Sequence, residues 1–227
     1  MNEKLFDYIA VCPTAFHTCA HSADMLRESG YTELCEAHRW EIVPGGKYFV
    51  TRNGSSLIAF RVPAGEIAGF MMTAAHGDSP AFKIKENAEL PDGNYLRLSV
   101  EKYGGMLCAP WLDRPLSVAG RVLVSEGDKL SVKLVDLKDP CAIIPNVAIH
   151  MNRNANDGMS YNAAVDMLPV WMSSEKGSFR AAVAKAAGVA EDAIVTGDLF
   201  LYDPQKGVTL GEYISAPRLD DLQCAFS

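Results

Sequence analysis

The sequence lacks an excess of basic residues: 21 Lys and Arg stand against 28 Asp and Glu, for a formal net charge of −7. Because a protein that binds duplex nucleic acid usually needs a basic face, we expect no nucleic-acid partner. No apolar run approaches the roughly 18 residues of a membrane span, so we expect no membrane partner. The first residues include Glu3 and Asp7 and have no long apolar core, unlike a signal peptide.

Closely spaced cysteine pairs are also absent, since the six cysteines are scattered without a C-x-x-C pair. Nothing marks the chain for secretion, so we expect a cytoplasmic protein with free, buried thiols. The sequence has no phosphate-binding loop, dinucleotide fingerprint, G-x-S-x-G elbow or H-E-x-x-H motif. A composition of 48% hydrophobic and 22% charged residues is typical of a globular chain with a sizeable core.

Helical spacing of apolar residues predicts two helices near the start of the chain, over 3–12 and 20–29. A third is predicted over 178–187, with Ser178 as its N-cap and Gly188 as its stop. The last residues, 217–227, also begin like a helix, and their apolar pattern stops without a cap or a polar tail.

Two strand patterns occur in the first third of the chain. Asn53-Gly54 lies between the β-rich runs 47–51 and 57–62 and predicts a hairpin. The continuous apolar run 70–75 predicts a strand buried on both faces, as in the middle of an α/β sheet.

The character of the sequence changes after about Ile84. Short alternating segments follow, separated by Gly, Asp and Pro, which indicates a separate β-rich module. The segments are 95–100, 121–126, 130–137 and 198–203.

His76 and Asp78 are the first candidate site residues, because they follow the predicted buried strand. Ligands gather beyond the carboxyl ends of strands in open α/β sheets. A neutral imidazole can bind a metal while the aspartate accepts the other ring N–H and fixes the tautomer. The alternative is a polar loop in which Asp78 caps a turn before Pro80.

Asp220 is the second candidate, because one carboxylate can bridge two divalent cations in a hydrolytic site. The alternative is that Asp220 and Asp221 only favour the positive end of the last predicted helix. His150 is the third candidate. If the segment is extended, alternating apolar neighbours place it on the opposite face, where it is a surface, core-rim or site residue.

Seven motifs occur in an order that resembles the aspartyl aminopeptidase family of dinuclear zinc metallopeptidases over essentially the whole chain. They are Cys12-Pro13-Thr14-Ala15-Phe16-His17, Pro44-Gly45-Gly46-Lys47-Tyr48-Phe49, His76-Gly77-Asp78-Ser79-Pro80, Tyr103-Gly104-Gly105, the run 111–121 (WLDRPLSVAGR), Ala148-Ile149-His150 and Ser215-Ala216-Pro217-Arg218-Leu219-Asp220. The resemblance implies a zinc-peptidase (phosphorylase/hydrolase-like) α/β domain, interrupted by a β-rich dimerisation or lid domain. On this reading residues 1–85 begin the catalytic domain, 86–212 form the inserted domain, and 213–227 resume the catalytic domain, which is incomplete.

The resemblance also implies the role of each candidate residue. His76 corresponds to a zinc ligand, Asp78 to the acid that orients this histidine, and Asp220 to the carboxylate that bridges two zinc ions. His150 corresponds to a lid-domain histidine that reaches a neighbouring subunit's active site and helps to hold substrate. Family members assemble as dimers and then dodecamers, and they remove N-terminal residues, acidic Asp or Glu in the best-known branch, from peptide substrates.

The family's catalytic Glu-Glu pair, a further carboxylate ligand and a final histidine ligand follow the bridging aspartate, whereas this sequence ends seven residues after Asp220. We therefore expect the N-terminal portion of such an enzyme, inactive by itself and a weak binder of zinc, because catalytic zinc normally has three protein ligands. The alternative is a natural non-catalytic module that dimerises with itself or with a full-length relative.

Overall fold

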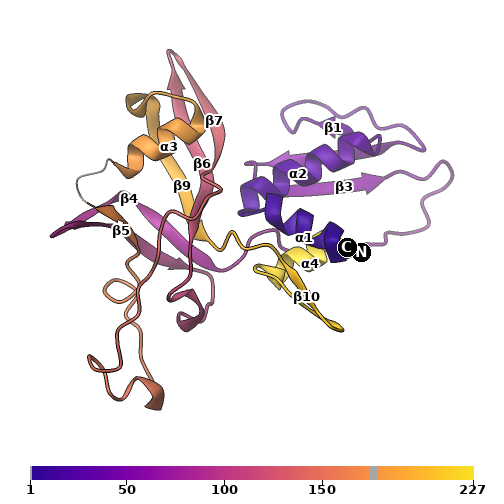
Figure 1. The fold of residues 1–227 in the computed structure, drawn as a ribbon. Coiled ribbons are helices and arrows are strands. Elements are labelled where there is room, and N and C mark those ends of the chain that lie inside the picture. The colour runs from indigo at the N-terminus through magenta and orange to yellow at the C-terminus, as the bar shows by residue number, and fades with distance from the viewer. Residues whose placement is uncertain (1, 174–177) are drawn as a thin grey trace. The chain divides into compact units, whose positions relative to one another are not determined.

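The computed structural model describes residues 2–173 and 178–227, and the chain divides into two compact units (Figure 1). The first unit contains residues 1–79 and 206–227, and the second contains residues 80–205. These boundaries lie several residues before the predicted ones at 85/86 and 212/213. The physical reason is that strand β4 (Ala81–Asp92) is continuous, so the change in sequence character near Ile84 falls inside a strand of the second unit.

Two helices open the first unit, α1 (Asn2–Val11) and α2 (Ala15–Glu28). Helix α2 begins five residues before its predicted start, because Thr14 has an extended backbone and stands at the N-cap. Gly30 follows the helix with a φ of +79°, a left-handed conformation that glycine adopts without steric cost.

The sheet of the first unit has the order β1-β2-β3, from β1 (Thr32–Leu34), β2 (Lys47–Arg52) and β3 (Ser56–Arg61). Strand β1 is parallel to β2, and β2 is antiparallel to β3. Asn53 and Gly54 have φ values of +53° and +63°, as a tight hairpin turn with the twist of its strands requires. The predicted hairpin is therefore confirmed.

The predicted buried strand at 70–75 is wrong. The structure assigns no strand between β3 and β4, and Phe70, Met71 and Met72 are exposed. An extended segment needs a neighbour for its backbone N–H and C=O groups before it becomes part of a sheet. Within the described ranges, β3 pairs with β2 alone and no strand pairs with residues 70–75.

The first unit ends with a short hairpin and a helix. Strands β10 (Val208–Leu210) and β11 (Tyr213–Ser215) pair antiparallel, and α4 (Leu219–Phe226) follows them. Leu222 of α4 joins Leu5, Tyr8 and Ile9 of α1 in one buried cluster. The last segment of the chain is therefore anchored on the first.

The second unit is built on a six-stranded antiparallel sheet of order β7-β6-β9-β4-β5-β8, which confirms the β-rich character predicted for this stretch. Besides β4, its strands are β5 (Tyr95–Tyr103), β6 (Ser117–Glu126), β7 (Lys129–Asp136), β8 (Val170–Ser173) and β9 (Ile194–Tyr202). The 3-10 helices η1 (Ala109–Trp111), η2 (Ala155–Asp157) and η3 (Glu191–Ala193) lie in its connections.

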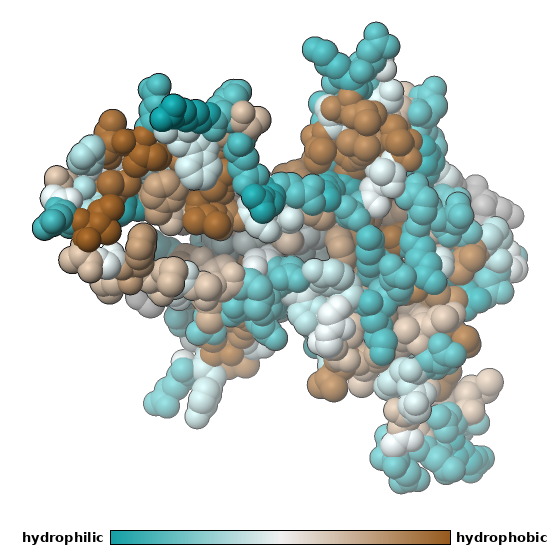
Figure 2. Space-filling view, turned by 180° about the vertical axis from the view of Figure 1, so that it is seen from behind, coloured by the Kyte–Doolittle hydropathy of each residue, from teal (hydrophilic) through white to brown (hydrophobic). Residues whose placement is uncertain are grey.

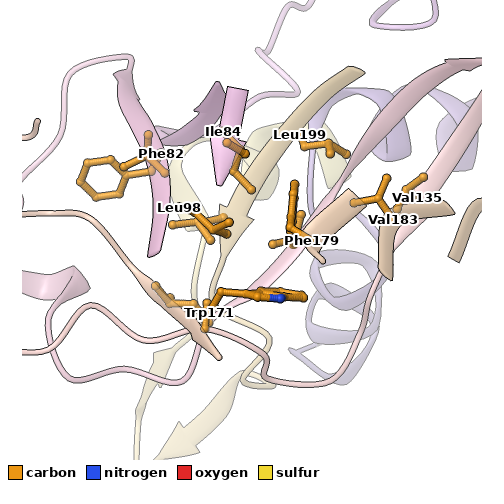
Figure 3. Close-up of a cluster of buried hydrophobic side chains, with 14 of the residues drawn as sticks. Phe82, Ile84, Leu98, Val135, Trp171, Phe179, Val183 and Leu199 are labelled. Atoms are coloured by element: carbon orange, nitrogen blue, oxygen red, sulfur yellow. The ribbon is translucent and has the colours of Figure 1, made fainter. Parts of the chain in front are cut away.

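Helix α3 (Phe179–Ala187) packs its apolar side on this sheet and forms the core with it (Figure 3). Trp171 of β8 meets Phe179 edge-on at 5.2 Å between ring centroids, and Leu98 is fully buried among the same side chains. The Ser178 side chain accepts a hydrogen bond from the Ala181 N–H, and Gly188 has a φ of +68°. The predicted cap and stop are confirmed.

In the described part of the chain, no helix is long and apolar enough to cross a membrane. All six cysteines are free, as predicted. Cys12 and Cys19 are buried, but Cys35 and Cys224 are exposed, so the expectation of burial is wrong for these two. Neither side chain belongs to a core cluster.

Candidate metal centre

Three side chains from distant parts of the sequence converge in the first unit. His76 lies in the segment that follows β3, and Asp220 and Asp221 lie at the start of α4. The His76 Nε2 atom is 3.2 Å from Asp220 Oδ1 and 3.8 Å from Asp221 Oδ2. One ligand atom from each residue lies within 4.8 Å of the others, so the three side chains can hold one metal ion.

The other nitrogen of the His76 ring faces Asp78. His76 Nδ1 is 3.0 Å from the main-chain oxygen of Asp78 and 3.3 Å from its Oδ1. When Nδ1 carries the proton and donates it to Asp78, the Nε2 lone pair points toward Asp220 and Asp221. The structure therefore brings Asp78 to the histidine as a partner for the ring, rather than using it only to cap a turn.

The start of α4 is not helical. Asp220 and Asp221 have non-helical backbone dihedrals, and the peptide bond between them is cis. Both acids stand in the first turn of α4, as the alternative expects, but their non-helical dihedrals make this start irregular, so favouring a regular helix start is not their only role. Their backbone and side chains also serve tertiary contacts: Ser79 Oγ donates to the Asp220 main-chain oxygen at 2.9 Å, and the His76 N–H donates to Asp221 Oδ2 at 3.1 Å.

Asp221 and Ser79 were missed as site residues by sequence reasoning. Asp221 was visible only as a second acid beside Asp220, and Ser79 only as part of a polar loop. Their contacts join segments more than 140 residues apart, which no local pattern reports. The one sequence signal that points to Ser79 as a site residue is its position in the same motif as His76 and Asp78.

The electrostatics of the cluster favour positive charge at His76. The hydrogen bond to the Asp78 main-chain oxygen raises the pKa of the His76 imidazole above its ordinary value, and the carboxylates of Asp221, Asp78 and Asp220 act in the same direction. Hydrogen bonds from the Cys224 thiol and from the His76 N–H lower the pKa of the Asp221 carboxyl. The lowered pKa of Asp221 therefore keeps a negative charge beside the ring at neutral pH.

The residues present fit a zinc ion. An imidazole nitrogen and carboxylate oxygens are donors that Zn²⁺ takes in proteins, and the backing of Nδ1 by Asp78 is the outer contact that orients such a ligand. When the imidazole is neutral, its Nε2 lone pair and the carboxylates of Asp220 and Asp221 face one point, and a cation bound there takes the place of the proton that these carboxylates otherwise favour on His76. A cation at this point satisfies all three.

His150 lies in the second unit and is exposed. Residues 149–151 form a turn, closed by the Met151 N–H on the Ala148 oxygen at 2.8 Å, so the extended alternation predicted here is wrong. Val147, Ile149 and Met151 are exposed with it, because this long connection between β7 and β8 contributes only single bridges to the sheet.

Residues 8–227 match the protein family described as aminopeptidase I zinc metalloprotease (M18). The chain belongs to the M18 family. It is 42% identical over 234 residues to the probable M18 family aminopeptidase 2 of Clostridium acetobutylicum, with 97% of this chain and 54% of that protein covered. It is 39% identical over 239 residues to the protein of the same name from Stutzerimonas stutzeri, with 100% and 56% covered.

Solved structures agree with this assignment. The chain matches a structure described as Chaetomium thermophilum mApe1 with a TM-score of 0.86 and 34% identity, over 97% of this chain and 55% of that one. It matches a chain in a complex of Ape4 and Nbr1 with a TM-score of 0.92 and 31% identity, over 97% and 48%. The chain thus spans about half the length of the curated relatives and solved structures that it matches.

Proposed function

We propose that this chain is the N-terminal portion of an M18 zinc aminopeptidase that acts in the cytoplasm on peptides with an acidic Asp or Glu at the N-terminus. The convergence of His76, Asp220 and Asp221 on one point carries the proposal. The family match supports the reaction class, and the resemblance to aspartyl aminopeptidases supports the acidic preference.

In this proposal His76 and Asp220 are zinc ligands, and Asp220 is the carboxylate shared by two zinc ions of the complete enzyme. Zinc held by these residues would supply Lewis-acid chemistry, which polarises a carbonyl and lowers the pKa of a bound water. Asp78 holds the His76 ring by its Nδ1 atom. Asp221 accepts the His76 N–H and thereby ties the backbone of the histidine segment to α4.

The second unit is the proposed dimerisation and lid domain, which brings His150 to the substrate of a neighbouring subunit. Its exposure in a turn, among exposed apolar neighbours, suits a residue that is covered only in an assembly. A relative described as the S. cerevisiae mApe1 dodecamer matches the chain with a TM-score of 0.79 and 27% identity, which supports self-association from dimer to dodecamer as the proposed state.

Zinc binding by the chain alone tests the site without requiring catalysis. We expect weak binding of Zn²⁺ by calorimetry, lost in His76→Ala and in Asp220→Ala and retained in His38→Ala, an exposed histidine outside the cluster. Equal binding by His76→Ala and His38→Ala refutes the ligand assignment.

Peptide hydrolysis tests the activity. The chain by itself is expected to be inactive, whereas the polypeptide extended by the remaining M18 sequence is expected to cleave peptides that begin with Asp or Glu faster than those that begin with Leu or Lys. Activity of the isolated chain, or a preference for Leu or Lys in the extended protein, contradicts the corresponding part of the proposal.

A second candidate function is a non-catalytic assembly module, favoured by one observation. Strand β7 is an edge strand, and Leu130, Val132 and Leu134 are exposed on one of its faces. Such a strip suits pairing with a second copy. Light scattering on the isolated chain tests this candidate: a strict monomer that never joins a full-length M18 enzyme rules it out. A dimer broken by Val132→Lys fits both candidates, and peptide hydrolysis by the extended polypeptide then decides between them.

A further inference from the structure

The segment that carries His76 has little packing of its own. Residues 63–76 are all exposed, with large apolar side chains among them. Figure 2 shows apolar side chains gathered on the surface of the first unit, at the left of the view. Gly77 is the first partly buried residue after this stretch. The contacts of Gly77 are therefore the nearest packing that fixes His76 and Asp78 on either side of it.

Gly77 packs on the side chain of Thr18 in α2. A Cβ at Gly77 comes within 3.0 Å of Thr18 Cγ2 and 3.5 Å of Thr18 Cβ, and the shorter contact is too tight for the threonine to keep its place. Thr18 is buried, and its Oγ1 donates to the Thr14 main-chain oxygen at 3.1 Å. A β-branched side chain in a helix has few rotamers, and this hydrogen bond favours the one observed. The Thr18 methyl group is therefore a fixed surface against which the backbone at Gly77 rests.

Arg218 holds the other metal-binding segment from α1. It stands two residues before Asp220 with a φ of +56°, and its Nη2 donates to the Ile9 main-chain oxygen at 2.9 Å. This oxygen lies in the last turn of α1, where carbonyl groups lack their helical partners and carry partial negative charge. The last turn has no basic residue of its own, so the Arg218 guanidinium supplies the cation there. The bond ties the start of α4 to the end of α1.

The buried thiol of Cys12 lies between these two contacts. It forms a hydrogen bond with the Thr18 side chain, and the charge of Arg218 acts on it. Burial outweighs both and raises the pKa of the Cys12 thiol to about 12, so the group stays neutral. Thr18 and Arg218 therefore approach the same corner between α1 and α2, and from it they reach two different segments of the metal centre.

We propose that Thr18 and Arg218 are positioning residues of the metal centre. Thr18 sets the place of His76 through Gly77, and Arg218 sets the place of Asp220 through the end of α1. The inference rests on the proposed metal site, because it concerns the spacing of two of its ligands, whose nearest atoms lie 3.2 Å apart. Neither residue is among the three side chains that can hold the ion, so each acts through another residue.

Hydrogen exchange of the His76 N–H in the metal-free chain tests the positioning without zinc. In the unchanged chain this N–H is expected to be protected, because it donates to Asp221 Oδ2 at 3.1 Å. Gly77→Ala is expected to speed its exchange at least about tenfold, since the added Cβ overpacks the contact with Thr18. Thr18→Ser removes Cγ2 and leaves Cβ at 3.5 Å, an ordinary contact. The double variant Gly77→Ala/Thr18→Ser is therefore expected to exchange as slowly as the unchanged chain.

Calorimetry with Zn²⁺ on the same variants measures the consequence for the site. Gly77→Ala is expected to bind Zn²⁺ about tenfold more weakly, the usual cost of disturbing the support of a metal ligand, and Thr18→Ser to restore the binding. Arg218→Met is expected to weaken binding similarly and to speed exchange at His76, because it releases the segment that carries Asp221. Arg218→Lys keeps a cation at the end of α1 and is expected to recover most of the loss. Melting temperatures check that each variant is folded.

Gly69→Ala and Arg61→Met are the matched controls within the first unit. A Cβ at Gly69 meets nothing within 4 Å, and Arg61 is an exposed arginine of β3. Both variants are expected to exchange at His76 and to bind Zn²⁺ as the unchanged chain does.

Three results overturn the proposal. They are equal exchange at His76 in Gly77→Ala and its control, a double variant that Thr18→Ser does not restore, and an Arg218→Met chain that loses melting temperature but binds Zn²⁺ like its control. The last is the result of a merely structural role. If the unchanged chain binds no Zn²⁺, the proposed ligand assignment fails, while the exchange measurements still decide the positioning.

Discussion

His76 Nε2 and Asp220 Oδ1 lie 3.2 Å apart although their residues belong to the two separate stretches of the first unit, which flank the whole second unit in the sequence. The contact exists because the chain leaves the first unit after Ser79 and returns at Lys206. Ser79 Oγ holds the Asp220 main-chain oxygen, so the exit point and the returning segment are bonded directly. An inserted unit therefore leaves the candidate metal centre intact.

Asp78→Asn is predicted to weaken Zn²⁺ binding by about 10–100-fold, the usual cost of changing a residue that orients a metal-bound histidine. The asparagine keeps the main-chain oxygen that faces His76 Nδ1 and loses the charge of the carboxylate at 3.3 Å. Calorimetry with Zn²⁺ measures the change. Asp139→Asn, at an exposed position of the second unit, serves as the control and is expected to have no effect. Unchanged affinity in Asp78→Asn shows that the carboxylate does not act on the ring.

Local patterns predicted much of this fold because local chemistry decides it. Asn53-Gly54 supplies the positive φ values of a hairpin turn, and Ser178 caps α3 through its own side chain. The run 70–75 shows the opposite case. Its composition predicts a strand, but a strand also needs neighbours, and the pattern of one segment carries no information on their presence.

The candidate site was predicted in the same uneven way. His76 and Asp78 share one short motif, and an H-x-D spacing brings them together locally. The resemblance, rather than any spacing, linked Asp220 to them. Asp221 is not predicted as a site residue, because its contact with the His76 N–H spans 145 positions of the sequence. In the sequence alone it cannot be told apart from an acid that favours a helix start.

Gly120→Ala is predicted to destabilise the second unit by about 1–3 kcal/mol, the cost of forcing extra volume into a packed region. A Cβ at this position collides with the Asp198 main-chain oxygen and comes within 2.9 Å of Leu199 Cα on the neighbouring strand β9. These are backbone atoms of a sheet and cannot move aside separately. Urea denaturation measures the loss.

Gly105→Ala is the matched control, because a Cβ there meets nothing within 4 Å. It is expected to leave the midpoint of the urea transition nearly unchanged. Equal midpoints for Gly120→Ala and Gly105→Ala show that β6 and β9 are less closely packed than the structure has them.

The contribution of Asp198 to the stability of the second unit is predicted to be lost in acid. Partial burial by itself raises the pKa of its carboxyl, but hydrogen bonds from Lys83 and Arg121 outweigh burial, and the pKa is lowered overall. Lys83 Nζ lies 2.9 Å from Oδ1, and Arg121 Nη2 lies 3.0 Å from Oδ2. A carboxyl with a lowered pKa in the folded state stabilises the fold above its unfolded pKa, and this contribution is lost as the pH falls through the folded pKa.

Comparison of the unchanged chain with Asp198→Asn across pH isolates this contribution. Near neutral pH the variant is expected to be less stable by about 1 kcal/mol, a value discounted because the side chain is one-third exposed and screened by solvent. The difference in the free energy of unfolding is expected to shrink as the pH drops below the ordinary carboxyl range. A difference that stays constant with pH assigns the effect to packing rather than to charge.

His150→Ala is predicted to lower kcat/KM of the complete M18 enzyme by at least about tenfold, or ~1.4 kcal/mol of transition-state stabilisation, with its zinc retained. Activity is expected to fall because the proposed role of His150 is to hold substrate. Zinc is expected to stay because His150 lies in the second unit, outside the cluster of His76, Asp220 and Asp221, so its loss removes no ligand of that cluster. Asn154→Ala, an exposed residue of the same connection, is the control for a general disturbance of the loop. Kinetics with an Asp-initiated peptide, metal analysis and light scattering are measured on the same samples. If His150→Ala loses zinc, the histidine is part of the metal centre; if it loses only the assembly, the residue acts at the subunit interface and holds no substrate.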